Sequence, residues 1–268
     1  MKEKIGIIGG GNMGAAIING IYQDYIVKVC EKDPNRRRYL KRRFSLDIDT
    51  IEGIIQDSSI VILAIKPQDF DSVLKELSIA ISSARVRCRK RIRIISIAAG
   101  ITTAYIERRL GVGIRIVRAM PNLPAQVGMG ITAVCAGQFS KKKDLRDACN
   151  IFDKVGSTVI VDESQMDAVT AVSGSGPAYV FLFVEYLNKA AKFLGLKELG
   201  NKLVIDTLRG SLRLLETQKA DAATLRAMVT SKGGTTQAAM DVFFANNVEK
   251  IFKDAIIAAR KRAKELSR

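Results

Sequence analysis

The residues best suited to chemistry stand near the start of the chain, in a glycine-rich turn. Gly9-Gly10-Gly11-Asn12-Met13-Gly14 follows the apolar run Ile5–Ile8 and opens a helical stretch from Met13 to Ile21. The first, third and sixth residues fit the pattern G-x-G-x-x-G, whose glycines make a tight turn, admit a pyrophosphate and let the helix pack on the strand. The amides and the positive dipole end of such a helix hold phosphates. We therefore expect this segment to bind a dinucleotide, with an ordinary tight turn as the alternative.

A carboxylate follows the next expected strand, about twenty residues on, where such folds place the ribose. There the chain has Val29-Cys30-Glu31-Lys32-Asp33-Pro34-Asn35-Arg36. Glu31 can accept hydrogen bonds from the ribose hydroxyls of NAD, and its charge repels a 2′-phosphate, whereas Lys32 and the arginines after it attract one. The pattern favours NADH without excluding NADPH, unless Glu31 merely ends a strand.

Three further segments rich in small and turn residues each end an expected strand, at the edge where open α/β sheets bind ligands. They are Ala64-Ile65-Lys66-Pro67-Gln68, Ser96-Ile97-Ala98-Ala99-Gly100 and Arg118-Ala119-Met120-Pro121-Asn122-Leu123-Pro124. Small residues at positions 98–100 would let a flat nicotinamide ribose approach the backbone, and the two prolines would stiffen the loop that walls it. We expect these segments to line the ligand edge of the sheet.

The elements that position these residues follow from apolar periodicity. The first half alternates short β-branched runs with helical patterns, which is typical of a parallel sheet with crossover helices, and after about Asp162 only helical patterns remain. We expect strands at Ile5–Ile8, Ile26–Glu31, Ile60–Ile65, Ile92–Ile97, Ile114–Arg118, Ile131–Ala136 and near Thr158–Val161, and later helices at Tyr179–Phe193, Leu203–Leu215 and Val242–Lys264. The fold class is therefore α/β, with a Rossmann-like, doubly wound, mostly parallel sheet over residues 1–161 and an all-helical domain over residues 162–268.

One expected helix of the second half is apolar nearly all round, in the run Tyr179-Val180-Phe181-Leu182-Phe183-Val184. A helix of this kind must be buried on every side. A small helical domain supplies such burial poorly by itself. The pattern therefore predicts a dimer with interlocked helices.

Composition limits the chemistry open to the chain. Among its 268 residues there is no histidine, so a cofactor, or Lys, Asp, Glu, Ser, Thr and backbone groups, must act. The four cysteines lie far apart, so we expect free thiols and no metal site. No signal-peptide pattern is present and no apolar run reaches membrane-spanning length, so we expect a cytoplasmic protein. The net charge of +16 is gathered in basic runs, which are usually solvated but attract anions.

Two segments of the helical half combine glycines with hydroxyl side chains. Ser173-Gly174-Ser175-Gly176-Pro177-Ala178-Tyr179 is expected to be a flexible turn that leads into a helix. Val229-Thr230-Ser231-Lys232-Gly233-Gly234-Thr235-Thr236 places two glycines and four hydroxyls just before another helix. Amides aimed from a helix N-terminus can bind a carboxylate, although each segment alone is also compatible with an ordinary cap.

Taken together and in this order, the segments resemble the pyrroline-5-carboxylate reductase family from Ile5 to about Leu266. The most specific are residues 120–124, 173–179 and 230–236. The resemblance implies reduction of Δ1-pyrroline-5-carboxylate to L-proline, the last step of proline synthesis, with NADPH or NADH. It also implies a helical dimerisation domain, dimers that assemble further into decamers, and an active site completed by the partner subunit, so that activity requires the dimer.

Roles at individual residues follow from the same resemblance. The glycine turn would hold the dinucleotide together with Glu31, Ala64, Lys66, Pro67, Ala98, Ala99, Gly100, Pro121 and Asn122. Ser231, Gly233, Gly234 and Thr235 would hold the substrate carboxylate. Thr236 would be the catalytic residue, its hydroxyl bonded to the ring nitrogen, while the nicotinamide carries the hydride and solvent supplies the proton.

The chain departs from the family pattern at several places. Lys232 replaces a proline of the last motif, which removes a stiff turn residue and adds a charge near the expected carboxylate site. Lys219, Asp221 and Ala222 stand where the family tends to carry an acidic residue and a His-Pro pair, and the stretch Arg85–Arg91 is unusually basic. These changes bear on rate and cofactor preference more than on reaction class.

Two alternatives remain open at the level of sequence. A β-hydroxyacid dehydrogenase would need a helical lysine as acid or base, and Lys189 and Lys192 lie on a helix but lack that enzyme's surrounding pattern. A non-catalytic protein that binds a dinucleotide or nucleic acid is supported only by the sequence pI of about 9.8, because the basic runs match no nucleic-acid-binding motif.

Overall fold

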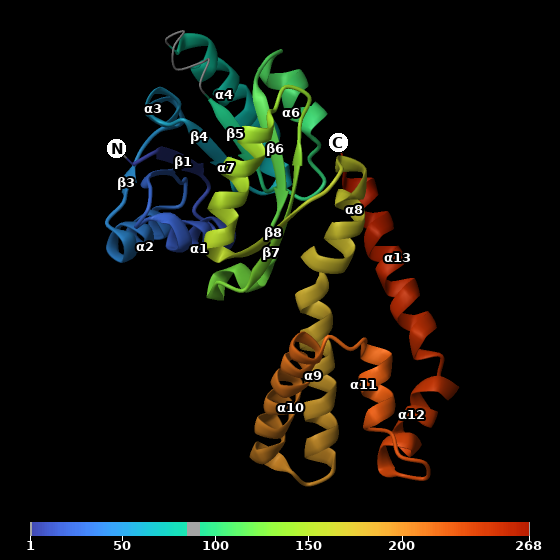
Figure 1. The fold of residues 1–268 in the computed structure, drawn as a ribbon. Coiled ribbons are helices and arrows are strands. Elements are labelled where there is room, and N and C mark those ends of the chain that lie inside the picture. The colour runs from blue at the N-terminus through green and yellow to red at the C-terminus, as the bar shows by residue number, and fades with distance from the viewer. Residues whose placement is uncertain (1, 85–91, 268) are drawn as a thin grey trace. The chain divides into compact units, whose positions relative to one another are not determined.

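The computed structural model describes residues 2–84 and 92–267, so the basic stretch Arg85–Arg91 lies outside the described residues. The chain forms two compact units (Figure 1). The first comprises Met1–Ser175 with Ala259–Arg268, and the second comprises Gly176–Ala258. The first unit therefore extends beyond residue 161, because Met166 is fully buried against Ala133 and Cys135 of the sheet.

The first unit is built on one eight-stranded sheet in the order β3-β2-β1-β4-β5-β6-β7-β8. All pairs are parallel except β6 with β7. The strands are β1 Lys4–Ile8, β2 Ile26–Cys30, β3 Asp47–Ile48, β4 Ile60–Leu63, β5 Arg93–Ser96, β6 Arg115–Met120, β7 Gly130–Ala136 and β8 Gly156–Ile160. The order of the first six strands is that of dinucleotide-binding sheets.

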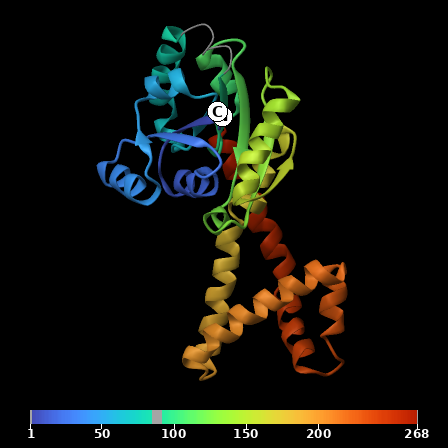
Figure 2. The ribbon, with the colours of Figure 1, turned by 60° about the vertical axis from the view of Figure 1, so that its left-hand side comes forward.

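Helices cover both faces of this sheet (Figures 1 and 2). They are α1 Asn12–Ile21, α2 Pro34–Phe44, α3 Ile51–Asp57, α4 Phe70–Ser83, α6 Thr103–Leu110, α7 Lys142–Phe152 and α8 Met166–Val169. α1, α2 and α7 pack on one face, while α3, α4 and α6 pack on the other. The predicted doubly wound α/β class is confirmed.

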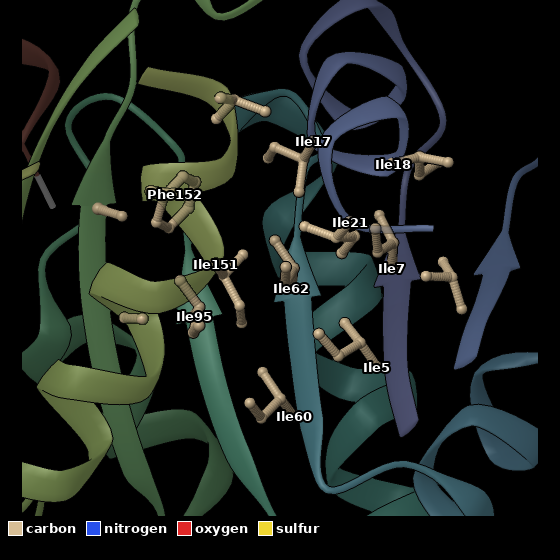
Figure 3. Packing of buried hydrophobic residues seen from close by; sticks show 14 of the residues in the cluster. Ile5, Ile7, Ile17, Ile18, Ile21, Ile60, Ile62, Ile95, Ile151 and Phe152 are labelled. Carbon is tan, nitrogen blue, oxygen red and sulfur yellow. The ribbon is translucent and has the colours of Figure 1, made fainter. Parts of the chain in front are cut away.

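Alternation along the strands sends side chains into both cores. In β4, Ile60 and Ile62 belong to the cluster under α1, whereas Val61 and Leu63 belong to the cluster under α3 and α4. Figure 3 shows the first of these clusters, with Ile62 near Ile17 and Ile21 of α1. Strands buried on both faces read as continuous apolar runs, which explains why the sequence revealed them so clearly.

Two features of the sheet were not predicted from the sequence. β3 has only two residues, too short for an alternating pattern to be recognised. β7 runs antiparallel to β6, because the connection through the tight turn Leu123–Val127 is too short for the crossover that a parallel pair needs.

The second unit is helical, as expected. α9 spans Gly176–Phe193, α10 Lys197–Gln218, α11 Ala222–Met228, α12 Thr235–Ala245 and α13 Val248–Leu266, whose last residues return to the first unit. The single helix expected over Val242–Lys264 was wrong. Asn246 donates its side-chain amide to the Val242 carbonyl at 2.8 Å, and Asn247 adopts a left-handed φ of 50°, which asparagine tolerates and which ends α12.

The expected flexible turn at Ser173–Gly176 is instead part of a helix. Residues Thr170–Gly174 form a π-helical turn, in which Ser175 N donates to the Thr170 carbonyl at 2.9 Å. Pro177, the second residue of α9, lies in its first turn as predicted, where a missing N–H costs no hydrogen bond.

One helical run among the described residues, the 31-residue Glu163–Phe193, is long and apolar enough to cross a membrane by length and composition. The expectation that no run reaches this length was wrong, because the helix continues through the π-helical turn. In α9 the side chains of Val180, Phe181 and Tyr186 are more than half exposed. Exposed apolar patches of this kind mark surfaces that another molecule covers.

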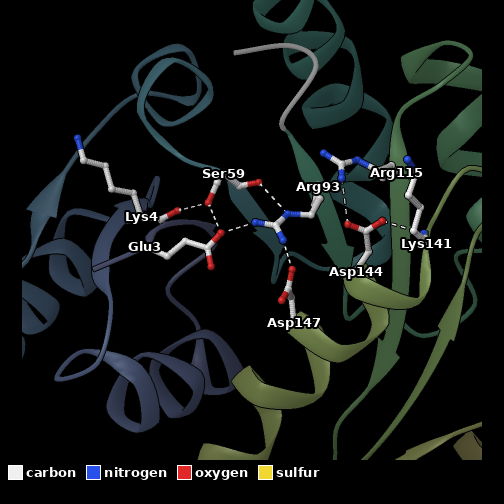
Figure 4. A network of polar contacts seen from close by, with 8 residues as sticks. All are labelled: Glu3, Lys4, Ser59, Arg93, Arg115, Lys141, Asp144 and Asp147. Carbon is white, nitrogen blue, oxygen red and sulfur yellow. Dashed lines mark hydrogen bonds and ion pairs between the residues drawn. The ribbon is translucent and has the colours of Figure 1, made fainter. Parts of the chain in front are cut away.

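A buried arginine ties together the amino ends of the sheet strands (Figure 4). The guanidinium of Arg93, at the start of β5 and only 8% exposed, donates to the carboxylates of Glu3 and Asp147. Ser59 Oγ donates to Glu3 at 2.7 Å, which extends the network to the residue before β4. One side chain thus joins β1, β4, β5 and α7 at the edge opposite the glycine turn.

We predict that Arg93→Ala lowers the free energy of unfolding by about 2–3 kcal/mol, because it leaves two carboxylates without their cation; the partial exposure of Glu3 keeps the loss below that of a fully buried pair. Urea unfolding measures this loss. Lys154→Ala is the control, since Lys154 and Asp24 form a half-exposed pair at 2.7 Å, and it should leave the midpoint nearly unchanged. Equal effects of the two variants would contradict the prediction.

Candidate active site

The glycine turn joins β1 to α1 by direct backbone packing. Gly9 has a φ of +100°, and a Cβ on Gly14 would lie 2.2 Å from the Gly9 carbonyl oxygen. Gly9 N donates to the Cys30 carbonyl at 2.8 Å, which fixes the turn to the end of β2. The first and third glycines of the motif are therefore required by conformation and by space.

The middle glycine of the motif faces open space. A Cβ on Gly11 would meet nothing within 4 Å, and Gly11 caps α1 without a side-chain hydrogen bond. The amides of the first helical turn have no intrahelical acceptors, and they carry the positive end of the dipole. The space beside Gly11 and the free amides of α1 fit the pyrophosphate of a dinucleotide.

Glu31 lies immediately after β2, where its carboxylate is tied to the glycine turn. Oε2 accepts from Gly10 N at 2.6 Å, and Oε1 accepts from Asp33 N at 2.8 Å. These bonds hold the carboxylate beside the turn, and each oxygen keeps a second lone pair for a further donor. Glu31 therefore stabilises the turn as well as presenting a negative charge where the ribose is expected.

A cavity of about 580 Å³ opens beside these residues. Five of the expected dinucleotide ligands line it: Gly9, Gly11, Glu31, Ala64 and Lys66. Ser72, Val73 and Glu76, near the start of α4, also line the cavity and were not expected from the sequence. The remaining lining residues are Ile8, Cys30, Lys32, Asp33, Arg36, Ile51, Ile65, Gln68 and Asp69. No sequence pattern pointed to these α4 residues, because α4 reaches the cavity only through the topology of the sheet.

The other expected dinucleotide ligands lie at the same carboxyl edge of the sheet. Pro67 begins the tight turn Pro67–Asp69 after β4. The segment Ala98–Gly100 follows β5, and Gly100 adopts a φ of +74° with room for no Cβ, because the Leu266 carbonyl oxygen would lie 2.7 Å away. The end of α13 therefore packs directly on this loop.

Pro121 and Asn122 follow β6, and both are buried. The Asn122 side chain is used within the fold: Oδ1 accepts from Ile131 N at 2.9 Å, and Nδ2 donates to the Ser173 carbonyl at 3.3 Å. The Asn122 amide thus joins the β6–β7 connection to the π-helical turn and holds the backbone of both segments in place.

A partly buried ion pair that the sequence did not reveal holds the same edge. Glu163 accepts from Thr103 N at 2.8 Å and from Thr103 Oγ1 at 2.6 Å, and Arg118, almost fully buried, donates to it at 3.3 Å. The network ties β6 and α6 to the start of the Glu163–Phe193 helix. These residues were missed because their spacing, 15 and 45 residues along the chain, carries no pattern.

The cysteines near this edge are poor nucleophiles. Burial raises the pKa of Cys135 to about 12, and burial also raises the pKa of Cys30, which lines the cavity. Both thiols therefore stay protonated at neutral pH. Neither residue supplies a thiolate nucleophile at this edge.

The expected substrate-binding residues lie in the second unit, at the start of α12. Gly233 has a φ of +73° and a Cβ on Gly234 would lie 2.4 Å from Ser231 Oγ, while Gly234 N donates to the Ser231 carbonyl at 3.0 Å. Gly234 caps α12, and Thr235 and Thr236 are its first two residues. The turn thus brings two hydroxyl side chains and the unpaired amides of one helix end together, an arrangement that suits an anion.

Comparison with known proteins identifies the relationship. Residues 163–266 match the family model for pyrroline-5-carboxylate reductase dimerisation, and residues 4–100 match that for NADP oxidoreductase, coenzyme F420-dependent. The pyrroline-5-carboxylate reductase of Mycobacterium leprae is 37% identical, with 98% of this chain and 96% of that protein aligned. The chain belongs to the pyrroline-5-carboxylate reductase family.

Solved structures of the family agree with this membership. A pyrroline-5-carboxylate reductase from Coxiella burnetii superposes with a TM-score of 0.89 at 36% identity, and the comparison covers 100% of both chains. The Plasmodium falciparum pyrroline carboxylate reductase, solved with NADP bound, has a TM-score of 0.86 at 30% identity, with 99% of this chain and 98% of that chain covered. As a member of the family, the chain is an oxidoreductase that uses NAD(P)H.

Membership also explains the exposed apolar helices. The dimerisation model covers α9 to α13, the elements whose large apolar side chains are exposed in the single chain. The chain therefore forms a homodimer through this helical region. The alternative acid–base residue Lys189 forms an exposed pair with Glu185 at 2.6 Å, as surface helices commonly do.

We predict that Gly11→Ala folds normally but binds NADPH about tenfold or more weakly, because the new methyl group fills the space that the pyrophosphate needs. NADPH fluorescence titration and thermal melting measure the two properties. Gly14→Ala is the contrasting variant, since its Cβ meets backbone, and it should lose about 1–3 kcal/mol of stability. Unchanged NADPH affinity of a folded Gly11→Ala protein would contradict the proposed phosphate site.

Proposed function

We propose that the chain reduces Δ1-pyrroline-5-carboxylate to L-proline with NADPH or NADH, the last step of proline synthesis. The observation that carries the proposal is the near full-length match, 98% of this chain, to the curated reductase of Mycobacterium leprae. That match includes both the glycine turn at the open cavity and the hydroxyl-rich start of α12. The first residues supply a dinucleotide site, and the second supply a site for a small carboxylate.

When bound, the nicotinamide supplies the hydride that reduces the imine carbon. The α1 amides bind the pyrophosphate, Glu31 faces the ribose, and the segments around Lys66–Pro67 and Ala98–Gly100, with Pro121 and Asn122 behind them, border the rest of the cofactor. These groups promote the reaction by orienting the nicotinamide toward the imine, since a correctly oriented pair of reactants removes much of the entropic barrier.

The α12 turn orients the substrate. The turn of Ser231, Gly233, Gly234 and Thr235 holds the carboxylate through its free backbone amides, while the Gly234 amide closes the turn on the Ser231 carbonyl. The Thr236 hydroxyl bonds the ring nitrogen. A cyclic imine becomes electrophilic once protonated, and solvent supplies that proton. A chain without histidine can therefore carry out the reaction.

Residues 1–161 serve as the dinucleotide-binding domain and residues 162–268 as the dimerisation and substrate-binding domain. We propose that the partner subunit completes each active site, that the dimers assemble further into a decamer, and that the enzyme is cytoplasmic. Size-exclusion chromatography with light scattering tests the assembly. Full activity from a stable monomer would contradict the shared active site.

The reaction itself is tested by steady-state oxidation of NADH and, separately, of NADPH with pyrroline-5-carboxylate. Loss of nicotinamide absorbance with formation of proline is expected for at least one cofactor. A folded dimer that binds NADPH but leaves the imine unchanged would contradict the substrate assignment and leave the dinucleotide site standing.

We predict that Thr236→Ala lowers kcat/KM for the imine about tenfold to hundredfold, because the variant loses one hydrogen bond to the reacting ring. Thr236→Ser should recover most of the activity, since it restores the hydroxyl. Thr217→Ala is the matched control: its hydroxyl is exposed on α10 and bonds the Arg213 carbonyl at 2.9 Å, so activity should be unchanged. Full efficiency of Thr236→Ala would remove this residue from the mechanism.

We predict that Glu31→Gln raises the ratio of NADPH to NADH efficiency about fivefold or more, because it removes the carboxylate charge that repels a 2′-phosphate. The side-chain carbonyl can still accept from one of the two backbone amides. Parallel assays with both cofactors measure the ratio, and Glu198→Gln on the exposed surface of α10 is the charge control. An unchanged ratio would mean that Glu31 acts only in holding the turn.

A further inference from the structure

A second, smaller groove lies between α1 and α2. Its volume is about 220 Å³, and its lining contains two arginines and several neutral polar side chains but no carboxylate. The lining residues are Asn12, Ala15, Ala16, Asn19, Arg36, Tyr39, Arg43, Phe44 and Gln126. A groove with guanidinium donors and amide groups but no acidic partner suits an anionic ligand.

Aromatic rings position both guanidinium groups. Arg36 lies 4.8 Å from the centroid of the Tyr39 ring, and Arg43 lies 5.5 Å from that of Phe44. The two rings meet edge to face at 6.5 Å. Cation–π contact orients a guanidinium without consuming its N–H donors in an ion pair.

The donors of these arginines are largely available. Arg36 uses two of its five N–H groups, with Nε on the Gly10 carbonyl at 2.5 Å and Nη2 on Asn12 Oδ1 at 3.4 Å. Among the residues that the structure describes, Arg43 forms no ion pair with a carboxylate. Both cations are therefore held in place while their charge remains uncompensated by the fold.

The helix dipole explains the basic residues at the end of α2 but not Arg36. Cations at the end of α2, namely Lys41, Arg42 and Arg43, favour the negative end of the helix dipole. Arg36 instead lies in the first turn, after the Asp33 cap, where the dipole disfavours a cation. A bound anion would offset this cost, either in the groove or in the adjoining dinucleotide cavity that Arg36 also lines.

We propose that the α1–α2 groove binds an oligophosphate, such as inorganic triphosphate or the phosphate chain of a nucleotide. Arg36 and Arg43 are seven residues apart, which corresponds to about 10 Å of helix rise. A chain of two or three phosphates is long enough to contact both guanidinium groups along this rise. Asn12, Asn19 and Gln126 supply further donors along the groove.

The cofactor's own phosphates are the competing source of the same chemistry, because Arg36 also lines the dinucleotide cavity. Arg43, Asn19 and Tyr39 line the groove and do not line the dinucleotide cavity. A titration in the presence of saturating NADPH therefore separates the two sites. This inference stands independently of the proposed reaction, since Arg43, Asn19 and Tyr39 lie outside the expected active site.

The test is isothermal titration calorimetry of the full chain with inorganic triphosphate, in saturating NADPH. We expect one triphosphate bound per chain, and we expect Arg43→Gln to weaken binding about tenfold through loss of a charge-assisted contact. Asn19→Asp, at an exposed position of α1, places a carboxylate in the groove and should weaken binding similarly. Arg42→Gln removes the same charge from the same helix outside the groove and should change the affinity less than threefold.

Three outcomes would overturn the proposal. Loss of triphosphate binding in saturating NADPH would assign the phosphates to the dinucleotide site. Equal effects of Arg42→Gln and Arg43→Gln would indicate diffuse attraction by the basic helix. ATP that binds more than tenfold tighter than inorganic triphosphate would show that a base, and not the phosphate chain, is recognised, whereas similar affinities support the proposal. NADPH oxidation without added phosphate should be unchanged in all three variants, which keeps a failed groove distinct from a failed reductase.

Discussion

Backbone packing at one turn sets the geometry of the whole nucleotide edge. The Gly9 carbonyl oxygen occupies the place that a Cβ on Gly14 would need, at 2.2 Å, so α1 can lie this close to β1 only with glycine there. That closeness places Gly11, the residue before α1, at the cavity, and Gly10 N reaches the Glu31 carboxylate. One contact between main-chain atoms therefore fixes the positions of the end of β2, the first turn of α2 and the cavity.

The two ends of the sheet are stabilised by different means. At the amino ends, Arg93 gathers carboxylates from β1 and α7 around one buried cation. At the carboxyl ends, loops carry the residues proposed to bind the cofactor, and Asn122, Glu163 and Arg118 hold those loops through side-chain hydrogen bonds and an ion pair. A rigid sheet with polar ties at both edges lets short glycine- and proline-rich loops keep a fixed shape, which placement of a flexible dinucleotide requires.

The helical unit depends on association. Side chains such as Phe181, Tyr186 and Phe252 are more than half exposed in the single chain, and a water-exposed surface of that kind is unfavourable. The family's dimerisation region covers these helices, and the same apolarity made one helical run long and apolar enough to cross a membrane by composition. Burial against a second copy accounts for this apolar surface. The residues that build the dimer and those proposed to hold the substrate lie in the same helical part of the chain.

The sequence by itself determined the sheet class, most of the strands, the glycine turn and the family, because local patterns of apolar residues and glycines encode them directly. It could not find the two-residue β3, the break at Asn246–Asn247 or the π-helical turn, since each depends on hydrogen bonds that leave no periodic signal. Only the tertiary structure decided that Glu31 is bonded to Gly10, that α4 lines the cavity, and that Arg36 and Arg43 share a groove with α1. These are contacts between segments far apart in the chain, and their distances are set by packing, not by spacing along the sequence.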